Sequence, residues 1–335
     1  MHPNYDKYRA VSGQLHEIWN TCASALEAIA LDEAYLDVTA QAETWEGARR
    51  IACAIKKRTR DELGLSCSVG VAYSKTAAKT ASEERKPDGY FEIPTAQDFV
   101  RLILDRDVRV LYTVGAKTAE KLKASGIRTV RDVRERQEEV IRRFGKQGQW
   151  ITQVAFGVDD RKVVPYQPQD AKSISREITF QENVNNYDFL KDVLLLLSLC
   201  VEERTRRVGL HGNGVSVKLT YPNMKGITRS HSVFSCDSAV RIYREAVRLL
   251  DQLDRQPVRL IGTGIYHLSG EEGRQLCLDG YFESSLFEQE NERRELLSAL
   301  QERYHLDFAG HLTQIYQAET LHKTVEYMRK RMQRR

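Results

Sequence analysis

The sequence predicts an α+β multidomain protein, and three observations lead to this fold class. Short strand and helix patterns alternate over residues 1–94, helical patterns alone fill residues 95–162, and the order βαββαβ follows in residues 172–270. Residues 163–171 contain two prolines and few apolar residues, so we interpret them as a linker between domains. Residues 271–335 are expected to form a charged helical tail.

The first region combines helical periodicity with short, β-prone runs bounded by turn residues. We expect its elements, in chain order, at residues 7–27 (helix), 29–38 (two strands around an acidic tip), 44–63 (helix), 67–72 (strand), 76–84 (helix) and 90–93 (strand).

The later regions differ from each other in periodicity. Residues 108–122 predict two helices joined at a turn that contains Gly115, with Gly126 as a C-cap. Beyond the linker, apolar alternation and amphipathic spacing predict strands and helices in turn. They are expected at residues 173–180 (strand), 187–206 (helix), 215–221 (strand), 228–234 (strand), 238–253 (helix) and 258–266 (strand).

Composition and charge restrict the class of protein. Hydrophobic residues make up 41% of the chain, which is too many for a disordered protein. The net charge of +4 is mildly basic and does not by itself establish nucleic-acid binding. The longest apolar run, residues 193–201, is far too short to cross a membrane, and residues 1–5 show no signal-peptide pattern, so we expect a cytoplasmic protein. The six cysteines have no zinc-site spacing and are expected to be reduced thiols.

Two adjacent acids, Asp32 and Glu33, lie at the expected hairpin tip. Neighbouring side chains on a regular strand point to opposite faces, but at a tight tip two carboxylates can converge. Converging carboxylates suit a hard cation such as Mg²⁺, and two such ions about 4 Å apart can activate a 3′-hydroxyl and stabilise a leaving pyrophosphate. The alternative is a solvated turn, which most Asp-Glu pairs form. Asp37, one strand further on, is interpreted as structural.

Three lysines lie on or next to the helix expected after the Gly70 strand. Lys75 and Lys79 are spaced i,i+4 and share a face, and Lys86 follows at the helix end. Lysines in this arrangement can hold a triphosphate as point charges, whereas the alternative is a solvated basic face. A phosphate-binding P-loop is excluded, because Ser74 stands where its second glycine belongs.

Two features are candidates for contact with nucleic acid. Backbone amides after Gly115, next to Lys117, lie at a helix start, where amides bind phosphate without reading sequence; an ordinary helical turn is the alternative. In residues 172–270, basic and hydroxyl side chains on one face of a sheet can follow a duplex backbone, and solvent-facing polarity is the alternative. These residues are Lys172, Ser173, Arg176, Lys218, Lys225, Arg229 and Ser230.

Four stretches together resemble the Y-family DNA polymerases, which include bacterial DNA polymerases IV and V. The first is Leu31-Asp32-Glu33-Ala34-Tyr35-Leu36-Asp37-Val38-Thr39, and the second is residues 67–79 with Lys86-Pro87-Asp88-Gly89. The third is the hairpin Val114-Gly115 with Ala119-Glu120-Lys121-Leu122, and the last is Lys172-Ser173-Ile174-Ser175. They occur in the family's order and at its spacing over residues 5–285.

The resemblance implies a fold and a set of site residues. Residues 1–94 correspond to a partial polymerase palm, residues 95–162 to a helix-hairpin-helix thumb, and residues 172–270 to a little-finger domain that grips template and primer. Asp32 and Glu33 correspond to catalytic carboxylates that bind Mg²⁺.

The same resemblance implies substrates and a biological role. Lys86 corresponds to a lysine that contacts the triphosphate of the incoming nucleotide, and Lys75 and Lys79 lie in the same motif. The implied partners are primer–template DNA and deoxynucleoside triphosphates. The implied activity is error-prone translesion synthesis in DNA repair, in DNA replication and in the SOS response, with binding to damaged DNA.

The chain departs from the family pattern at its start. Family members open with a strand that carries a further catalytic aspartate, followed by a fingers segment that binds the nucleotide. Residues 1–5 match a point after both, so we expect this chain to lack that aspartate and a central strand of the palm sheet. We favour truncation of an active polymerase, at the level of the gene or of the recorded sequence, and an inactive remnant that only binds primer–template DNA is the alternative.

Two further readings are weaker. A helix-hairpin-helix nuclease or repair glycosylase would need additional acids near the hairpin, and the sequence offers no convincing set. Residues 284–287 faintly resemble a peptide that binds the sliding clamp, but only Leu286 and Phe287 fit, so we favour an ordinary amphipathic segment.

Overall fold

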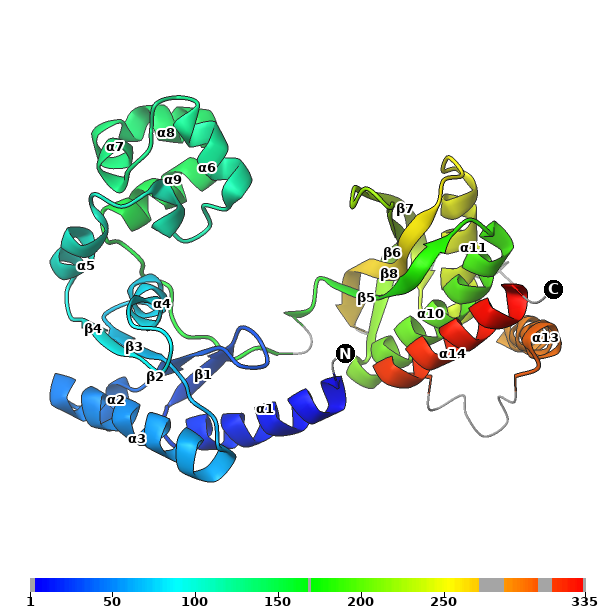
Figure 1. Ribbon diagram of the computed structural model, residues 1–335, viewed down its shortest axis with the longest axis horizontal. Coiled ribbons are helices and arrows are strands. Elements are labelled where there is room, and N and C mark those ends of the chain that lie inside the picture. The colour runs from blue at the N-terminus through cyan, green and yellow to red at the C-terminus, as the bar shows by residue number, and fades with distance from the viewer. Residues whose placement is uncertain (1–3, 168–169, 271–285, 307–314, 334–335) are drawn as a thin grey trace. The chain divides into compact units, whose positions relative to one another are not determined.

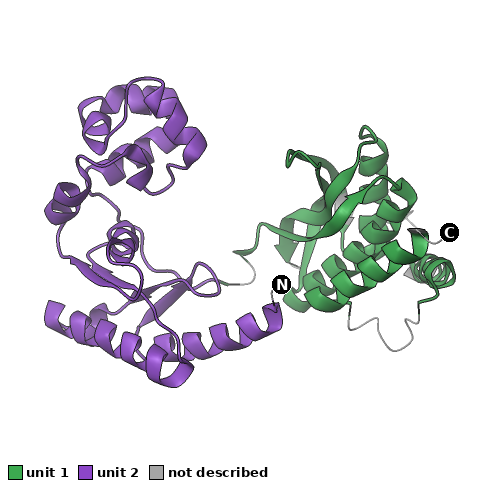
Figure 2. Ribbon diagram, in the orientation of Figure 1, with its two compact units in different colours: residues 1, 3, 167–335 green, residues 2, 4–166 purple. Residues whose placement is uncertain are grey.

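The computed structural model describes residues 4–167, 170–270, 286–306 and 315–333. The chain divides into two compact units, residues 4–166 and residues 167–335, which are described separately below (Figure 2). Within the described residues, no helix combines the length and the apolarity that a membrane span requires.

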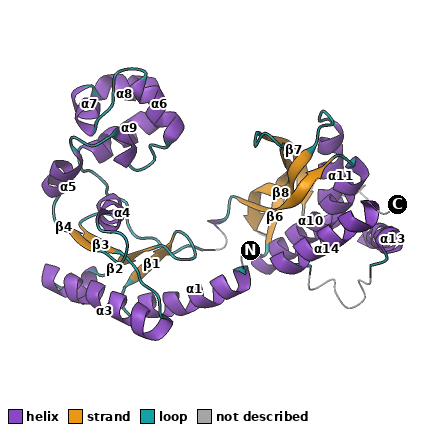
Figure 3. Cartoon of the chain, viewed as in Figure 1, coloured by secondary structure: helices purple, strands orange, loops and turns teal. Residues whose placement is uncertain are grey.

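The first part of unit 4–166 mixes helices and short strands (Figures 1 and 3). Helices α1 to α3 lie on one side of the strands and α4 on the other (Figure 1). The elements are α1 (Tyr5–Asn20), β1 (Ala25–Ala28), β2 (Ala34–Asp37), α2 (Thr39–Ala42), α3 (Trp45–Leu63), β3 (Val69–Ala72), α4 (Lys75–Glu84) and β4 (Tyr90–Ile93). The strands form two separate two-stranded sheets, an antiparallel β1–β2 hairpin and a parallel β3–β4 pair.

Two expectations for this part are corrected. The first helix ends at Asn20 instead of residue 27, and Ala25–Ala28, expected within it, forms the first hairpin strand. The hairpin therefore starts earlier than residue 29, although its acidic tip lies where we expected it. Pairing of Ala25 with Asp37 and of Ala28 with Ala34 fixes the strand register, and this tertiary pairing outweighs the helix preference of small residues.

Helix α4 packs directly on strand β3, and Gly70 makes this close approach possible. A Cβ atom at Gly70 would lie 2.2 Å from the backbone oxygen of Ala78, so a larger residue would push the helix away. Ser74 caps the helix, and its buried face carries Ala77 and Ala81 into the core. The strand and the helix that hold the predicted lysines are thus rigidly joined.

The rest of the unit consists of helices, as predicted. They are α5 (Ala96–Ile103), the 3₁₀ turn η1 (Val108–Val110), α6 (Ala116–Lys123), α7 (Val130–Glu135), α8 (Gln137–Phe144) and α9 (Lys146–Ala155). The first of the two helices expected in residues 108–122 is only the short η1 turn. Gly126 has the positive φ of 75° typical of a glycine that ends a helix, but the C-cap residue of α6 is Ala124.

Unit 167–335 contains the predicted βαββαβ order. Its elements are β5 (Ser173–Val184), α10 (Tyr187–Val208), β6 (Leu210–Thr220), β7 (Gly226–Cys236), α11 (Ala239–Asp251) and β8 (Val258–Gly270). The strands form one antiparallel sheet in the order β5-β8-β6-β7, and α10 and α11 cover one of its faces (Figure 1). The other face carries exposed side chains such as those of Ser173, Glu177 and Lys218, and no described helix covers it; we call it the open face.

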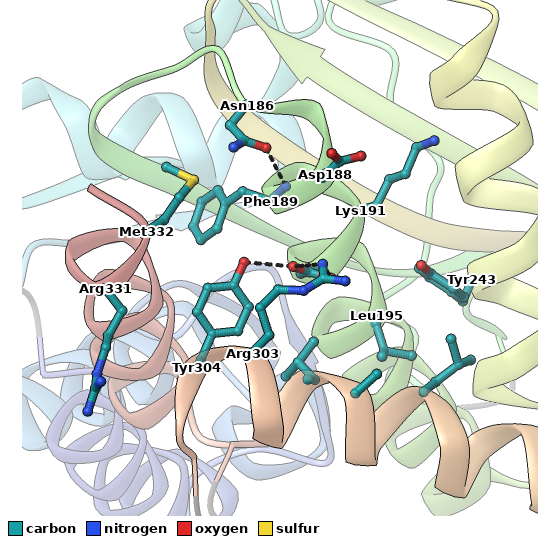
Figure 4. A pocket seen from close by; sticks show the side chains of 14 residues that line it. Asn186, Asp188, Phe189, Lys191, Leu195, Tyr243, Arg303, Tyr304, Arg331 and Met332 are labelled. Atoms are coloured by element: carbon teal, nitrogen blue, oxygen red, sulfur yellow. Dashed lines mark hydrogen bonds and ion pairs between the residues drawn. The ribbon is translucent and has the colours of Figure 1, made fainter. Parts of the chain in front are cut away.

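The predicted tail contains two helices that belong to the core of this unit. They are α13 (Leu286–Tyr304) and α14 (Ala318–Gln333), whose apolar side chains join the cluster around α10. Arg303 and Tyr304 both bind the carboxylate of Asp192 on α10, at 2.7 and 2.6 Å (Figure 4). A cavity of about 660 Å³ lies between these helices and is lined by Phe189 and Tyr243 among others (Figure 4).

Candidate active site

The acidic tip connects β1 and β2 in a tight hairpin. The backbone N–H groups of Ile29 and Ala30 donate to the backbone oxygen of Glu33, at 2.9 and 3.2 Å, and close the turn. Asp32 is exposed and Glu33 is half-buried at the start of β2. Asp37, at the far end of β2, accepts a hydrogen bond from the backbone N–H of Thr39 at 3.0 Å, so it anchors the start of α2.

The lysine helix lies against this hairpin. Lys79 Nζ is 2.8 Å from Glu33 Oε1, which joins the middle of α4 to the acidic tip. Burial is the largest single influence on the pKa of Lys79 and lowers it, but hydrogen bonds to Glu33 and Glu83 outweigh burial, so the pKa is raised overall. The structure thus brings together one predicted acid and one predicted lysine from separate motifs.

A second acid, Glu83, extends this contact along α4. Its Oε1 atom lies 3.1 Å from Lys79 Nζ and 2.8 Å from Lys86 Nζ. The hydrogen bond from Lys86 is the largest influence on Glu83 and lowers the pKa of its carboxyl, and Lys79 lowers it further. Glu33, Lys79, Glu83 and Lys86 therefore form a continuous chain of alternating charges, which we call the ion-pair chain.

Lys75 is placed differently from the other two lysines. Its side chain is 9% exposed and forms an ion pair with Glu27 of β1. Its Nζ also donates to the backbone oxygen of Lys162 at 3.3 Å and lies 5.0 Å from the ring centre of Tyr35. A triphosphate could reach this ammonium group only if these contacts broke, so the geometry favours an anchoring role for Lys75.

Sequence reasoning missed a buried network that ties the helical region to α4. The Oδ2 atom of Asp159 accepts hydrogen bonds from the Thr76 backbone N–H and hydroxyl, at 2.9 and 2.6 Å. Arg161 forms a two-pronged ion pair with the same carboxylate, at 2.8 and 2.9 Å. Burial raises the pKa of Asp159, but the hydrogen bonds from Arg161 and Thr76 outweigh it, so this pKa lies well below its usual range.

Arg161 also contacts the helical region. Its guanidinium lies 4.9 Å from the ring centre of Tyr112 and 4.6 Å from that of Trp150. Cation–π contacts of this kind hold the charge in a defined direction. The only signal in the sequence was an acid and an arginine two residues apart in a loop, which is too common to mark a site.

The helix α6 begins at the predicted hairpin. Gly115 is its N-cap, with a φ of −76° that any residue adopts, and a Cβ atom there would meet nothing within 4 Å. The protein itself therefore does not require a glycine at this position. Lys117 follows in the first turn and is exposed. The start of α9 lies beside this hairpin, because the side chain of Gln147 donates to the Thr113 backbone oxygen at 3.4 Å.

The predicted residues of the β5-β8-β6-β7 sheet fall on two different faces. Ser173 and Lys218 lie on the open face, where Lys218 pairs with Glu177 at 2.8 Å. Arg176 lies two residues from each of the buried residues Ile174 and Ile178, so it shares their face of the strand and points to the helix-covered face.

Arg229, on β7, does not lie on the open face either. It stands opposite the buried Val217, and directly paired residues of an antiparallel ladder share a face. The expectation that Arg176 and Arg229 join Ser173 on one face is therefore wrong. Lys172 is exposed just before β5.

Residues 284–287, which faintly resemble a clamp-binding peptide and which we interpret as an ordinary amphipathic segment, lie partly outside the described residues. Ser284 and Ser285 lie outside the described residues, and only the backbone of Leu286 and Phe287, at the start of α13, is described. The resemblance to a clamp-binding peptide stays a prediction.

The chain is similar to known proteins in both sequence and fold. The family model described as "impB/mucB/samB family" matches residues 1–83, and the model of that family's C-terminal domain matches residues 171–278. The DNA polymerase IV of Methanoculleus marisnigri is 36% identical over 278 residues, which cover 82% of this chain and 76% of the relative. The DNA polymerase IV of Akkermansia muciniphila is 36% identical over 277 residues, which cover 81% and 75%.

Solved structures resemble the chain in fold. A Y-family DNA polymerase chimera, Dbh-Dpo4(243-245)-Dbh, matches with a TM-score of 0.71 at 24% identity and covers 80% of this chain and 78% of the chimera. An insertion ternary complex of Dbh DNA polymerase matches with a TM-score of 0.53 at 22% identity, with coverage of 80% and 78%.

Proposed function

The chain belongs to the impB/mucB/samB family of Y-family DNA polymerases, and we propose that it catalyses error-prone, template-directed DNA synthesis past damaged bases. The observation that carries the proposal is the contact between Glu33 and Lys79. It places the acidic tip, which the family resemblance assigns to catalysis, beside the helix that the resemblance assigns to the incoming nucleotide. The relatives' name, DNA polymerase IV, supports the same activity.

Asp32 and Glu33 fit a divalent cation by the chemistry of their oxygens. No group of three or more histidine, cysteine, aspartate or glutamate side chains with metal-site geometry occurs among the described residues. Mg²⁺ at nucleotide sites is nevertheless commonly held by one or two carboxylates together with substrate phosphates and water. These two carboxylates would hold Mg²⁺ with the nucleotide itself, and the bound ion would stabilise negative charge on the reacting phosphate oxygens.

The lysines have separate roles in this proposal. Lys79 contacts Glu33 of the acidic tip, Lys86 is joined to Lys79 through Glu83, and the side chains of both lysines are partly exposed, so they bind the phosphates of the incoming nucleotide. Lys75 fixes the start of α4 to β1 and orients the other two lysines. Neutralising the triphosphate in this way lowers the repulsion between the nucleotide and the carboxylates of the tip.

Primer–template DNA is proposed to contact both units. The exposed amides after Gly115, with Lys117, suit a phosphate of the DNA backbone. Lys172, Ser173 and Lys218 lie on or beside the open sheet face and suit further phosphates. Roles in DNA repair and in the SOS response, and a cytoplasmic location, stay predictions.

Primer extension tests the function. The wild-type chain, with Mg²⁺ and four deoxynucleoside triphosphates, is compared with the double variant Asp32→Ala/Glu33→Ala on undamaged and damaged templates. We expect extension by the wild type alone, and equal affinity of both proteins for primer–template DNA measured at one salt concentration. DNA binding without extension by the wild type would support the inactive DNA-binding alternative. A wild type that neither binds DNA nor extends the primer would reject both the polymerase and the DNA-binding alternative.

A further inference from the structure

We infer that Glu83 is an internal competitor of the nucleotide: its carboxylate occupies, in the empty site, the two ammonium groups that the triphosphate must take over. The inference rests on the proposed function, since it assigns Lys79 and Lys86 to the incoming nucleotide. Its basis is the ion-pair chain, in which one oxygen of Glu83 lies 3.1 Å from Lys79 Nζ and 2.8 Å from Lys86 Nζ.

The position of Glu83 explains why it contacts both lysines. It follows Lys79 by four residues on α4, so the two side chains share a helix face, and it precedes Lys86 by three. Lys86 lies just beyond the helix end, where the chain turns toward β4. A single carboxylate therefore spans the two cations at the place where two neighbouring phosphate groups would have to lie.

Exposure shows which of the helix's ion pairs can exchange partners. The side chains of Glu83 and Lys86 are both 47% exposed, whereas Lys75, in its pair with Glu27, is 9% exposed. Exposed pairs are weak because water screens them, so a ligand with several negative charges can displace them at low cost. The Lys75 pair stays fixed, and the pairs of Glu83 open when the triphosphate binds.

Charge balance gives the direction of the effect. Glu33, Lys79, Glu83 and Lys86 sum to zero net charge, with two carboxylates and two ammonium groups. A triphosphate that enters must separate Glu83 from both lysines and then tolerates its negative charge nearby. Glu83 thus lowers the affinity for the triphosphate and for pyrophosphate, and it gives the lysines a partner again once pyrophosphate has left.

The test measures nucleotide affinity without catalysis. dATP is titrated calorimetrically, in Mg²⁺, into the protein bound to a primer–template with a dideoxy-terminated primer and a templating thymine. We expect Glu83→Gln to bind dATP roughly two- to tenfold more tightly than the wild type, the range expected when one or two exposed pairs no longer compete. In extension assays, the KM for dATP and the inhibition constant of pyrophosphate should fall by a similar factor. A merely structural acid would produce the opposite change, a loss of affinity.

Two comparisons make the test specific. The matched control is Glu62→Gln, because Glu62 lies in the last turn of α3, is also 47% exposed and pairs with Arg58 of the same helix. It should leave dATP affinity unchanged. In a Lys79→Met/Lys86→Met background, Glu83→Gln should have a much smaller effect, since competition requires the lysines and only direct repulsion between Glu83 and the triphosphate is left.

Each result has a defined meaning. Unchanged or weaker dATP binding by Glu83→Gln in a folded protein overturns the inference, and so does an equally large gain in the lysine-free background. A wild-type chain that binds no dATP overturns it as well. A wild-type chain that binds dATP but does not extend the primer would reject the proposed function alone, and the binding comparison would still decide the role of Glu83.

Discussion

Replacing Asp159 by asparagine would test whether its buried network holds unit 4–166 together. The side chain of Asp159 is 2% exposed and accepts two hydrogen bonds from Thr76 and two from the guanidinium of Arg161. Asparagine keeps one acceptor oxygen but removes the charge, so Arg161 would be left without an ionised partner. Breaking a buried pair in this way costs about 3–5 kcal/mol, and the partial exposure of Arg161 reduces this to about 2–4 kcal/mol.

The loss in free energy of unfolding caused by Asp159→Asn should become smaller as the pH falls. The pKa of Asp159 is lowered in the folded protein, because hydrogen bonds from Arg161 and Thr76 outweigh burial. Its contribution to stability is therefore complete above the unfolded pKa of about 3.9 and is lost as pH falls through the lower folded pKa. The difference in free energy of unfolding between the wild type and Asp159→Asn should be constant near neutral pH and shrink in acid.

The assay can be confined to the relevant unit. The sequence contains three tryptophans, Trp19, Trp45 and Trp150, and all lie in unit 4–166. Urea unfolding followed by tryptophan fluorescence therefore reports this unit. Asp160→Asn is the control, because Asp160 is exposed and the charge change is the same. A cost for Asp159→Asn below about 1 kcal/mol, or equal to that of the control, would refute the reasoning.

Three further predictions use the same logic. Gly115→Ala should leave the melting temperature unchanged, since the added Cβ meets nothing, yet weaken primer–template binding several-fold by fluorescence anisotropy; equal affinity would argue against a phosphate at this hairpin. Lys75→Met should lower the midpoint of urea unfolding, because it leaves Glu27 without its ammonium partner, and a change in nucleotide KM alone would contradict the anchoring role. Tyr304→Phe removes a hydrogen bond to Asp192 and should destabilise unit 167–335 by about 1 kcal/mol in calorimetry, whereas no shift would mean that α13 packs without it.

Local periodicity predicted most of the elements but not the hairpin's start. Strand β6 was readable because Val215, Val217 and Leu219 alternate and are all buried. Residues 25–28, Ala-Leu-Glu-Ala, favour helix by propensity, and only their pairing with β2 makes them a strand. Such pairing involves residues about ten positions away, which a periodicity argument does not weigh.

The sequence predicted which residues form the candidate site, but it did not predict which distant residues they contact. The sequence placed the three lysines near one another but could not distinguish the anchoring role of Lys75 from the role of Lys79, because Glu27, the acid that pairs with Lys75, is 48 residues away. Asp159 and Thr76 are 83 residues apart, so their contact was equally invisible. The error over Arg176 was avoidable from the sequence. Arg176 is three residues from Ser173, and strand alternation alone places two such residues on opposite faces of the sheet.

The exposure of the lysines along α4 explains how one helix can serve both as a support and as a binding surface. Exposed side-chain fractions rise from 9% at Lys75 to 33% at Lys79 and 47% at Lys86. A buried cation is costly to separate from its acidic partner, whereas an exposed cation exchanges partners readily. The first turn is therefore fixed to β1 and to the Asp159 network, and this rigid end supports the exchangeable end. Mutations at the start of α4 should act mainly on stability, and mutations at its end mainly on ligand affinity.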